Sequence, residues 1–121
     1  MENLIEVNIT DLDEIAIKGK NLVINNLSLA ENDDRSEMPE DHALVFLELS
    51  CSAKNKSDRQ RQVSLMVIGY DQNKKPLWAI HLSPLGLSPN RTESMTSHGL
   101  IVPKGTKDRT ATLWLAAYGD L

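Results

Sequence analysis

The side chains best suited to catalysis in this chain are a single cysteine, Cys51, and three histidines. A cysteine beside a histidine can act as a nucleophile, because the histidine takes the thiol proton. Cys51, however, falls in phase with Val45, Leu47 and Leu49 in a segment where apolar and polar residues alternate. Every second residue of a strand lies on the same face, so we predict a buried, unreactive thiol.

Possible metal ligands gather in the acidic loops. His42 follows Glu40 and Asp41, but no pair of histidines has a spacing that brings zinc ligands together. Calcium prefers carboxylate oxygens, and four loop aspartates are candidates for it: Asp11, Asp13, Asp33 and Asp34. Their loops lack the ordered spacing and the glycine of a helix-loop-helix calcium site. We therefore predict no metal site, with calcium at these aspartates as the alternative.

Common signatures of catalysis and cofactor binding are absent. The sequence has no glycine-rich nucleotide fingerprint, phosphate loop, zincin motif, Cys-x-x-Cys pair or Gly-x-Ser-x-Gly elbow. These absences predict a protein that is not an enzyme and takes no cofactor. An unrecognised catalytic site stays open as an alternative, and it requires a pocket that joins His81 or His98 to carboxylates.

Length and composition set the class of protein. The chain has 121 residues, 40% hydrophobic and 25% charged, which is typical of one globular domain over residues 1–121. A formal charge of -4 disfavours nucleic acid as a partner. No apolar run is long enough to span a membrane, no secretory signal is visible, and a lone cysteine fits a reducing compartment. We expect a cytoplasmic protein, or an extracytoplasmic one if a native signal has been removed.

Short runs with a period of two predict an all-β fold. Seven runs are typical of strands and an eighth, polar run of an edge strand: residues 4–9, 15–18, 22–30, 43–52, 63–70, 77–83 and 110–118, then 91–98. The runs on either side of Asp71 and Pro76 predict a β-hairpin, whereas two prolines and a glycine predict an irregular segment at 82–90. We predict an antiparallel β-sandwich of about seven to eight strands, immunoglobulin-like or fibronectin-like, with a small β-barrel as the alternative.

The stretch 49–78 resembles bacterial immunoglobulin-like domains of the FxLYD kind. In those domains one strand ends in Asn followed by Ser or Asp, and the next strand ends in an aromatic residue and Asp. The first place is taken here by Asn55, Ser57 and Asp58, and the second by Tyr70 and Asp71. Val67 and Gly69 replace the Phe and Leu of the family motif. The resemblance implies a sandwich fold and a binding role, with no catalytic residues.

Charged residues separate into two ends of the predicted sandwich. If the strands alternate in direction, every second loop lies at the same end. One end then becomes basic, because it collects Lys18, Lys20, Lys54, Lys56, Arg59, Arg61 and Arg91. A basic end can attract an acidic protein, a phosphate or RNA, or it can simply keep the loops soluble.

Several strands are apolar on both faces, although a sandwich strand has only one inner face. Val67 alternates with Ile68, for example, and Leu115 alternates with Trp114. The second apolar face needs a cover, which another chain can provide. We predict an interface formed by Met66, Ile68, Tyr70, Trp78, Ile80, Trp114 and Tyr118. The alternative is an ordinary core in which our assignment of the faces is wrong by one residue.

Three functions are consistent with these patterns. The first is a non-enzymatic protein-protein interaction or assembly module, in which the surplus apolar face binds a second copy or a partner protein. The second is a small ligand-binding domain of the carbohydrate type, with Trp78, Trp114 and Tyr118 stacking on a sugar. An exposed tryptophan bordered by polar groups on a monomer distinguishes the second from the first. The third is the unrecognised enzyme described above.

Overall fold

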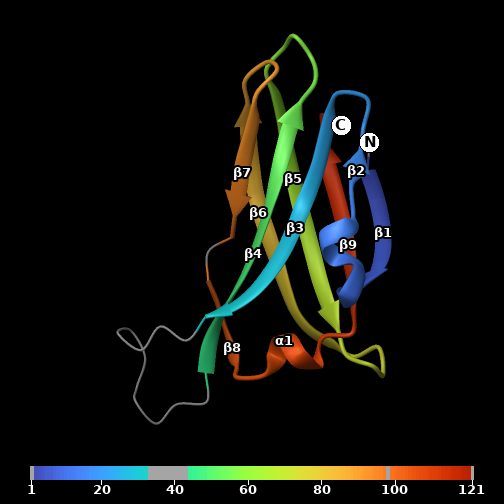
Figure 1. Cartoon of the computed structure of the whole chain (residues 1–121), viewed down its shortest axis with the longest axis vertical. Coiled ribbons are helices and arrows are strands. Elements are labelled where there is room, and N and C mark those ends of the chain that lie inside the picture. Colours follow the sequence, from blue (N-terminus) through green and yellow to red (C-terminus); the bar gives the residue numbers. More distant parts are fainter. Residues whose placement is uncertain (1, 33–43, 98, 121) are drawn as a thin grey trace.

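Two antiparallel sheets form the molecule, and the computed structural model describes residues 2–32, 44–97 and 99–120 of it (Figure 1). The first sheet has the strand order β1 (Glu2–Asn8), β9 (Thr112–Gly119), β5 (Arg61–Tyr70) and β6 (Pro76–Leu87). The second has the order β2 (Ile17–Lys18), β3 (Leu22–Asn32), β4 (Leu44–Asn55) and β7 (Thr92–Thr96), and β8 (Leu100–Pro103) pairs with the other half of β4. Two short helical segments, η1 (Ile9–Glu14) and α1 (Thr106–Arg109), connect the sheets.

The predicted sandwich is confirmed, and the barrel alternative is wrong because the sheets do not close on each other. Period-two alternation builds the core between them. Leu47 and Leu49 of β4 are fully buried, as are Leu65 of β5 and Leu115 of β9. Cys51 lies in the same layer at 3% exposure, so its predicted burial is confirmed.

The hairpin predicted at residues 63–83 is present as β5 and β6. The carboxylate of Asp71 accepts hydrogen bonds from the backbone N–H groups of Asn73 at 2.8 Å and Lys75 at 3.0 Å. Lys74 has a positive φ of 64°, the left-handed conformation that closes such turns. Local turn chemistry therefore sets the register of this strand pair, apart from two one-residue irregularities, between Gly69 and Tyr70 and between Val63 and Leu65.

Four elements differ from the prediction. Strand β6 continues to Leu87 through the segment expected to be irregular, because it lies at the edge of its sheet, where a proline is tolerated. Strand β8 was not predicted, since its residues, Leu100–Pro103, do not alternate between apolar and polar. The segments η1 and α1, with six and four residues, are also too short to show a helical pattern.

Candidate binding face

Apolar side chains continue from strand to strand across the outside of the first sheet. Trp114 of β9 lies opposite Ile68 of β5, which lies opposite Ala79 of β6. In the next row, Ala116 lies opposite Met66. We call this surface the outer apolar face; its members are Met66, Ile68, Tyr70, Ala79, Trp114 and Ala116.

Trp114 is the most exposed large residue of this face. Its side chain is 40% exposed, while Met66, Ile68 and Tyr70 are half-buried. The Tyr70 and Trp114 rings meet edge to face, with centroids 6.3 Å apart and planes at 63°. This geometry is favourable for aromatic pairs and holds the indole in place, so its outward surface is available for contact.

An ion pair borders the tryptophan. Lys74 Nζ donates to Glu6 Oε1 at 2.6 Å, linking the β5–β6 turn to β1. The hydrogen bond from Lys74, its positive charge, and a hydrogen bond from Trp114 lower the pKa of the Glu6 carboxyl. With Tyr70 and Trp114, these two charged residues line a depression of about 240 Å³. An aromatic wall with a charged rim is the combination that ligand pockets use for affinity and orientation.

His81 and Tyr118 lie toward the opposite end of the first sheet. Their rings are parallel within 5°, with centroids 6.0 Å apart, and His81 Nε2 lies 2.5 Å from the Tyr118 hydroxyl. A bond between the outer atoms at that centroid distance means that the rings meet edge to edge rather than face to face. Tyr118 on β9 thus bridges to β6 across the intervening strand β5.

Two residues predicted for the interface lie in the core instead. Trp78 and Ile80 are 6% and 5% exposed, so the prediction of their face is wrong. Gly69 lies opposite Trp78 on the inner side, where a β carbon would overlap the indole. The indole Nε1 donates to Thr110 Oγ1 at 3.0 Å. A glycine inside an apolar strand marks a close approach, and it was the signal that could have placed Trp78 correctly.

The loops that carry the predicted basic residues meet at one end of the sandwich (Figure 1). The N–H of Lys56 donates to Asn21 O at 2.7 Å, and the N–H of Asn55 donates to Arg91 O at 2.9 Å. The buried Asn55 side chain ties these loops together, because its amide donates to Arg59 O at 2.7 Å and to Leu87 O at 3.0 Å. Of the seven basic side chains, Arg61 is half-buried. The other six are exposed: Lys18, Lys20, Lys54, Lys56, Arg59 and Arg91.

The described ranges contain no cluster of side chains suited to binding a metal ion. Asp11 and Asp13 lie on η1, whereas Asp33 and Asp34 lie outside the described residues. Across residues 2–32, 44–97 and 99–120, no group of three or more His, Cys, Asp or Glu side chains could hold an ion. Burial raises the pKa of the Cys51 thiol to about 11, far from that of a reactive cysteine.

Comparison with known proteins gives little more. No family model and no curated protein matches the sequence. One similar solved structure is that of a DUF1425 family member from Shewanella sp. pv-4, with a TM-score of 0.43 and 13% identity over 88% of this chain and 86% of that chain. A likeness at this level carries no argument, so the sandwich assignment depends on the strand pairing of the chain itself. Within the described part, none of the helices is long and apolar enough to cross a membrane.

Proposed function

We propose that this domain is a non-enzymatic assembly module whose outer apolar face binds a second copy of the chain. The observation that carries the proposal is Trp114, 40% exposed on β9 at the border of an apolar surface that continues over β5 and β6. Tryptophan, tyrosine and methionine are enriched at the centres of protein interfaces. Such a surface is costly to leave in water and is stabilised when another apolar surface covers it.

A second copy suits this face because the charges at its border compensate each other. Glu6 and Lys74 form an ion pair, so two copies can meet without a net like charge at the contact. With strands ~4.8 Å apart and a rise of ~3.4 Å per residue, three strands of five residues measure roughly 14 by 17 Å. Two such faces bury on the order of 500 Å², which is below the size of stable complexes, so we expect a weak dimer that forms only at high concentration.

Light scattering over a concentration series tests this proposal. We expect a dimer whose Kd rises about 30-fold or more in Trp114→Glu, because a charge replaces the most exposed aromatic side chain of the face. Ile101→Glu is the matched control, since Ile101 is 57% exposed but lies on β8 of the second sheet. Circular dichroism verifies that both variants fold. A wild type that stays monomeric at about 1 mM, where even a very weak dimer is populated, rejects self-association.

A ligand-binding function of the carbohydrate type is the second candidate. The depression beside Trp114 supports it, because an exposed aromatic surface lies next to polar groups of Glu6 and Lys74. A panel of mono- and disaccharides titrated against tryptophan fluorescence tests this function. Trp78 is buried, so a bound sugar is expected to change only the acrylamide-accessible emission of Trp114. This candidate is rejected if no sugar changes the tryptophan emission of the wild-type protein by more than the same sugar changes the emission of free indole.

We also infer immunoglobulin-like connectivity and a cytoplasmic location. The pairs β3–β4–β7 and β6–β5–β9 follow the order of strands A, B, E and C′, C, F in such sandwiches, and β1 occupies the place of strand G. These sandwiches serve widely as interaction domains.

The inferred cytoplasmic location is supported by Cys51, because a free, buried thiol fits a reducing compartment.

A further inference from the structure

Among the residues that the structure describes, no strand lies beside half of β3 on one of its sides. β2 pairs only with Val23 and Ile24, although β3 has eleven residues. Beyond this point, residues 28–32 pair with β4 on one side only, as far as the described residues extend.

Backbone hydrogen bonds show which residues of β3 face this open side. The Leu49 carbonyl accepts from the Ser97 N–H at 2.8 Å, and the Leu49 N–H donates to Ser97 Oγ at 2.9 Å. Both polar groups of Leu49 therefore point toward β7 and away from β3. Leu29 lies opposite Leu49, so its own N–H and C=O point away from β4, into the open side. The alternation repeats every two residues, so Glu31 presents its N–H and C=O in the same direction.

The other half of β3 supports this assignment. There the Leu22 carbonyl accepts from the Gly19 N–H at 2.7 Å on the open side, and the Asn21 carbonyl accepts from the Lys56 N–H at 2.7 Å on the β4 side. A one-residue shift between Asn25 and Ser28, where Asn26 has a φ of 55°, moves the outward position from even to odd residues. The bulge thus sets the outward groups at Leu29 and Glu31.

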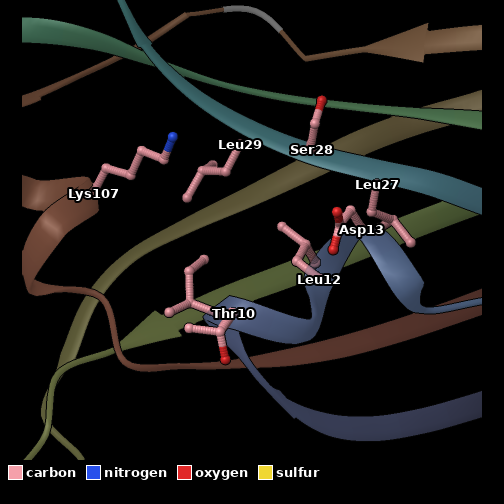
Figure 2. Close-up of a pocket in the computed structure, with 8 residues that line it drawn as sticks. Thr10, Leu12, Asp13, Leu27, Ser28, Leu29 and Lys107 are labelled. Carbon is pink, nitrogen blue, oxygen red and sulfur yellow. The ribbon is translucent and has the colours of Figure 1, made fainter.

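The open stretch lies between two helical segments. At one end η1 packs against β3, and at the other end Glu31 Oε1 accepts a hydrogen bond from the N–H of Gly105, directly before α1. A cavity of about 260 Å³ lies between them, lined by Ile9, Thr10, Leu12, Asp13, Leu27, Ser28, Leu29 and Lys107. Figure 2 shows Asp13 on the η1 side and Lys107 on the α1 side, with Leu29 between them. We call this site, residues 27–31 between η1 and α1, the edge slot.

We propose that the edge slot binds a short extended peptide of a partner protein as an added antiparallel strand, with an acidic side chain toward Lys107 and a basic one toward Asp13. Backbone donors and acceptors of Leu29 and Glu31 bind the peptide main chain, and the two charges fix its direction. Every strand pair in both sheets is antiparallel, and this pairing is the more stable one per residue. The slot spans roughly 13 Å, which suits about four residues.

A second copy of β3 is a poorer occupant. Its eleven residues exceed the slot, and it brings its own η1 and α1 against the same helical segments. A bulge and a lysine are also devices that protect sheet edges from pairing, so an edge that stays in water is the rival outcome. The edge slot lies away from the outer apolar face, and the two proposals fail independently.

Hydrogen exchange by NMR with defined peptides tests the edge slot. The probe is a capped peptide, Asp-Thr-Val-Thr-Lys, whose charges match an antiparallel strand, and its control has proline in place of valine. We expect the probe to slow exchange of the Leu29 and Glu31 amides about tenfold or more, because they gain partners. The amide of Ala30, which faces β4, is the internal reference and is expected to change little. No slowing at several millimolar probe, or equal slowing by the proline peptide, overturns the proposal.

A pair of lysine variants makes this test specific to the charge pattern. Lys107→Glu is expected to weaken probe binding about threefold or more by placing like charges together. Lys104→Glu, an exposed lysine that does not line the slot, is expected to leave binding within about twofold. Equal effects of both variants would mean that only net charge matters, which rejects the slot.

Discussion

The outer faces of the two sheets carry different kinds of side chain. On the second sheet, Ser50 and Ser52 of β4 lie opposite Thr96 and Ser94 of β7, and the Ser50 and Thr96 hydroxyl oxygens are 3.3 Å apart. On the first sheet, Met66, Ile68 and Trp114 occupy the equivalent outward positions. The inner faces, by contrast, are apolar in both sheets.

This difference separates the apolar faces that the fold requires from the one that it does not require. A sandwich requires one apolar face per sheet, and the second sheet meets that requirement with polar residues outward where β4 pairs with β7, although Leu44 and Ile101 are exposed where β4 pairs with β8. The first sheet has a second apolar face that contributes nothing to the core. The stability of the domain should therefore depend on inner residues of both sheets, while its interactions should depend on the outer face of only one.

The two tryptophans give the largest expected contrast. Trp78→Ala should lower the free energy of unfolding by about 3 to 5 kcal/mol, because it empties a core site and removes the bond to Thr110. Trp114→Ala, on the outer face, should cost about 1 kcal/mol or less. Urea denaturation of both variants at a protein concentration that favours the monomer provides the measurement. Similar losses in the two variants would contradict the division into a structural and a surplus face.

Adjacent positions of β4 give the next contrast, in pH dependence. Burial raises the pKa of Cys51 from 9.0 to about 11, so the neutral thiol favours folding. That contribution is complete below pH 9 and is lost as the pH rises toward 11, on the order of 2 kcal/mol. Cys51→Ala should remove this loss, and Ser52→Cys in that background should not restore it, because residue 52 is on the outer side. Parallel stability profiles from pH 8 to 11 in wild type and Cys51→Ala would refute the assignment.

Removing a hydroxyl group should raise the free energy of unfolding on the outer face of the first sheet but not on that of the second. Thr112 Oγ1 of the first sheet is buried and has no hydrogen-bond partner among the described residues. Thr112→Val should therefore raise the free energy of unfolding by about 1 kcal/mol. Thr96→Val removes a hydroxyl that pairs with Ser50 and should give no gain. Thermal unfolding of both variants distinguishes them, and a stabilised Thr96→Val beside an unchanged Thr112→Val would reverse the expectation.

The smallest expected effect concerns the ion pair beside Trp114. The hydrogen bond and the charge of Lys74 lower the pKa of Glu6, so this carboxylate favours folding above its ordinary pKa of 4.5 and loses that effect as the pH falls through the lowered value. Lys74→Met should raise the Glu6 pKa, as followed by NMR titration of its carboxyl. Lys75→Met, in the same turn, should not move it. Both partners are largely exposed, so neither variant should measurably change stability.

The period-two pattern was sufficient to predict most strands, the sandwich and the β5–β6 hairpin. It failed for Trp78 and Ile80, because which face a residue occupies depends on the register of the strand. The irregularity between Gly69 and Tyr70 sets that register in β6, and the one polar residue that marks the outer side of its central segment is His81, which is in phase with Ala79 and out of phase with Trp78.

The polar border of the candidate site had no local signal in the sequence. Glu6 and Lys74 are 68 positions apart, and they meet only because β1 joins the sheet beside β9 while the β5–β6 turn reaches toward it. The edge slot likewise depends on a bulge at Asn26 and on the shortness of β2. Such features follow from the pairing of distant strands, which composition and periodicity do not specify.

The pairing of the first and last strands affects how the domain bears mechanical load. Glu2 lies opposite Tyr118 and Asn8 opposite Thr112, so the two chain ends leave β1 and β9 on the same side of the molecule (Figure 1). Tension applied through these ends pulls the two strands apart crosswise and loads their hydrogen bonds one pair after another, since antiparallel bonds run perpendicular to the strands. The hydrogen bonds between β1 and β9 should consequently break one after another at low force. Strand β1, at the edge of the sheet that contains Trp114, should detach first.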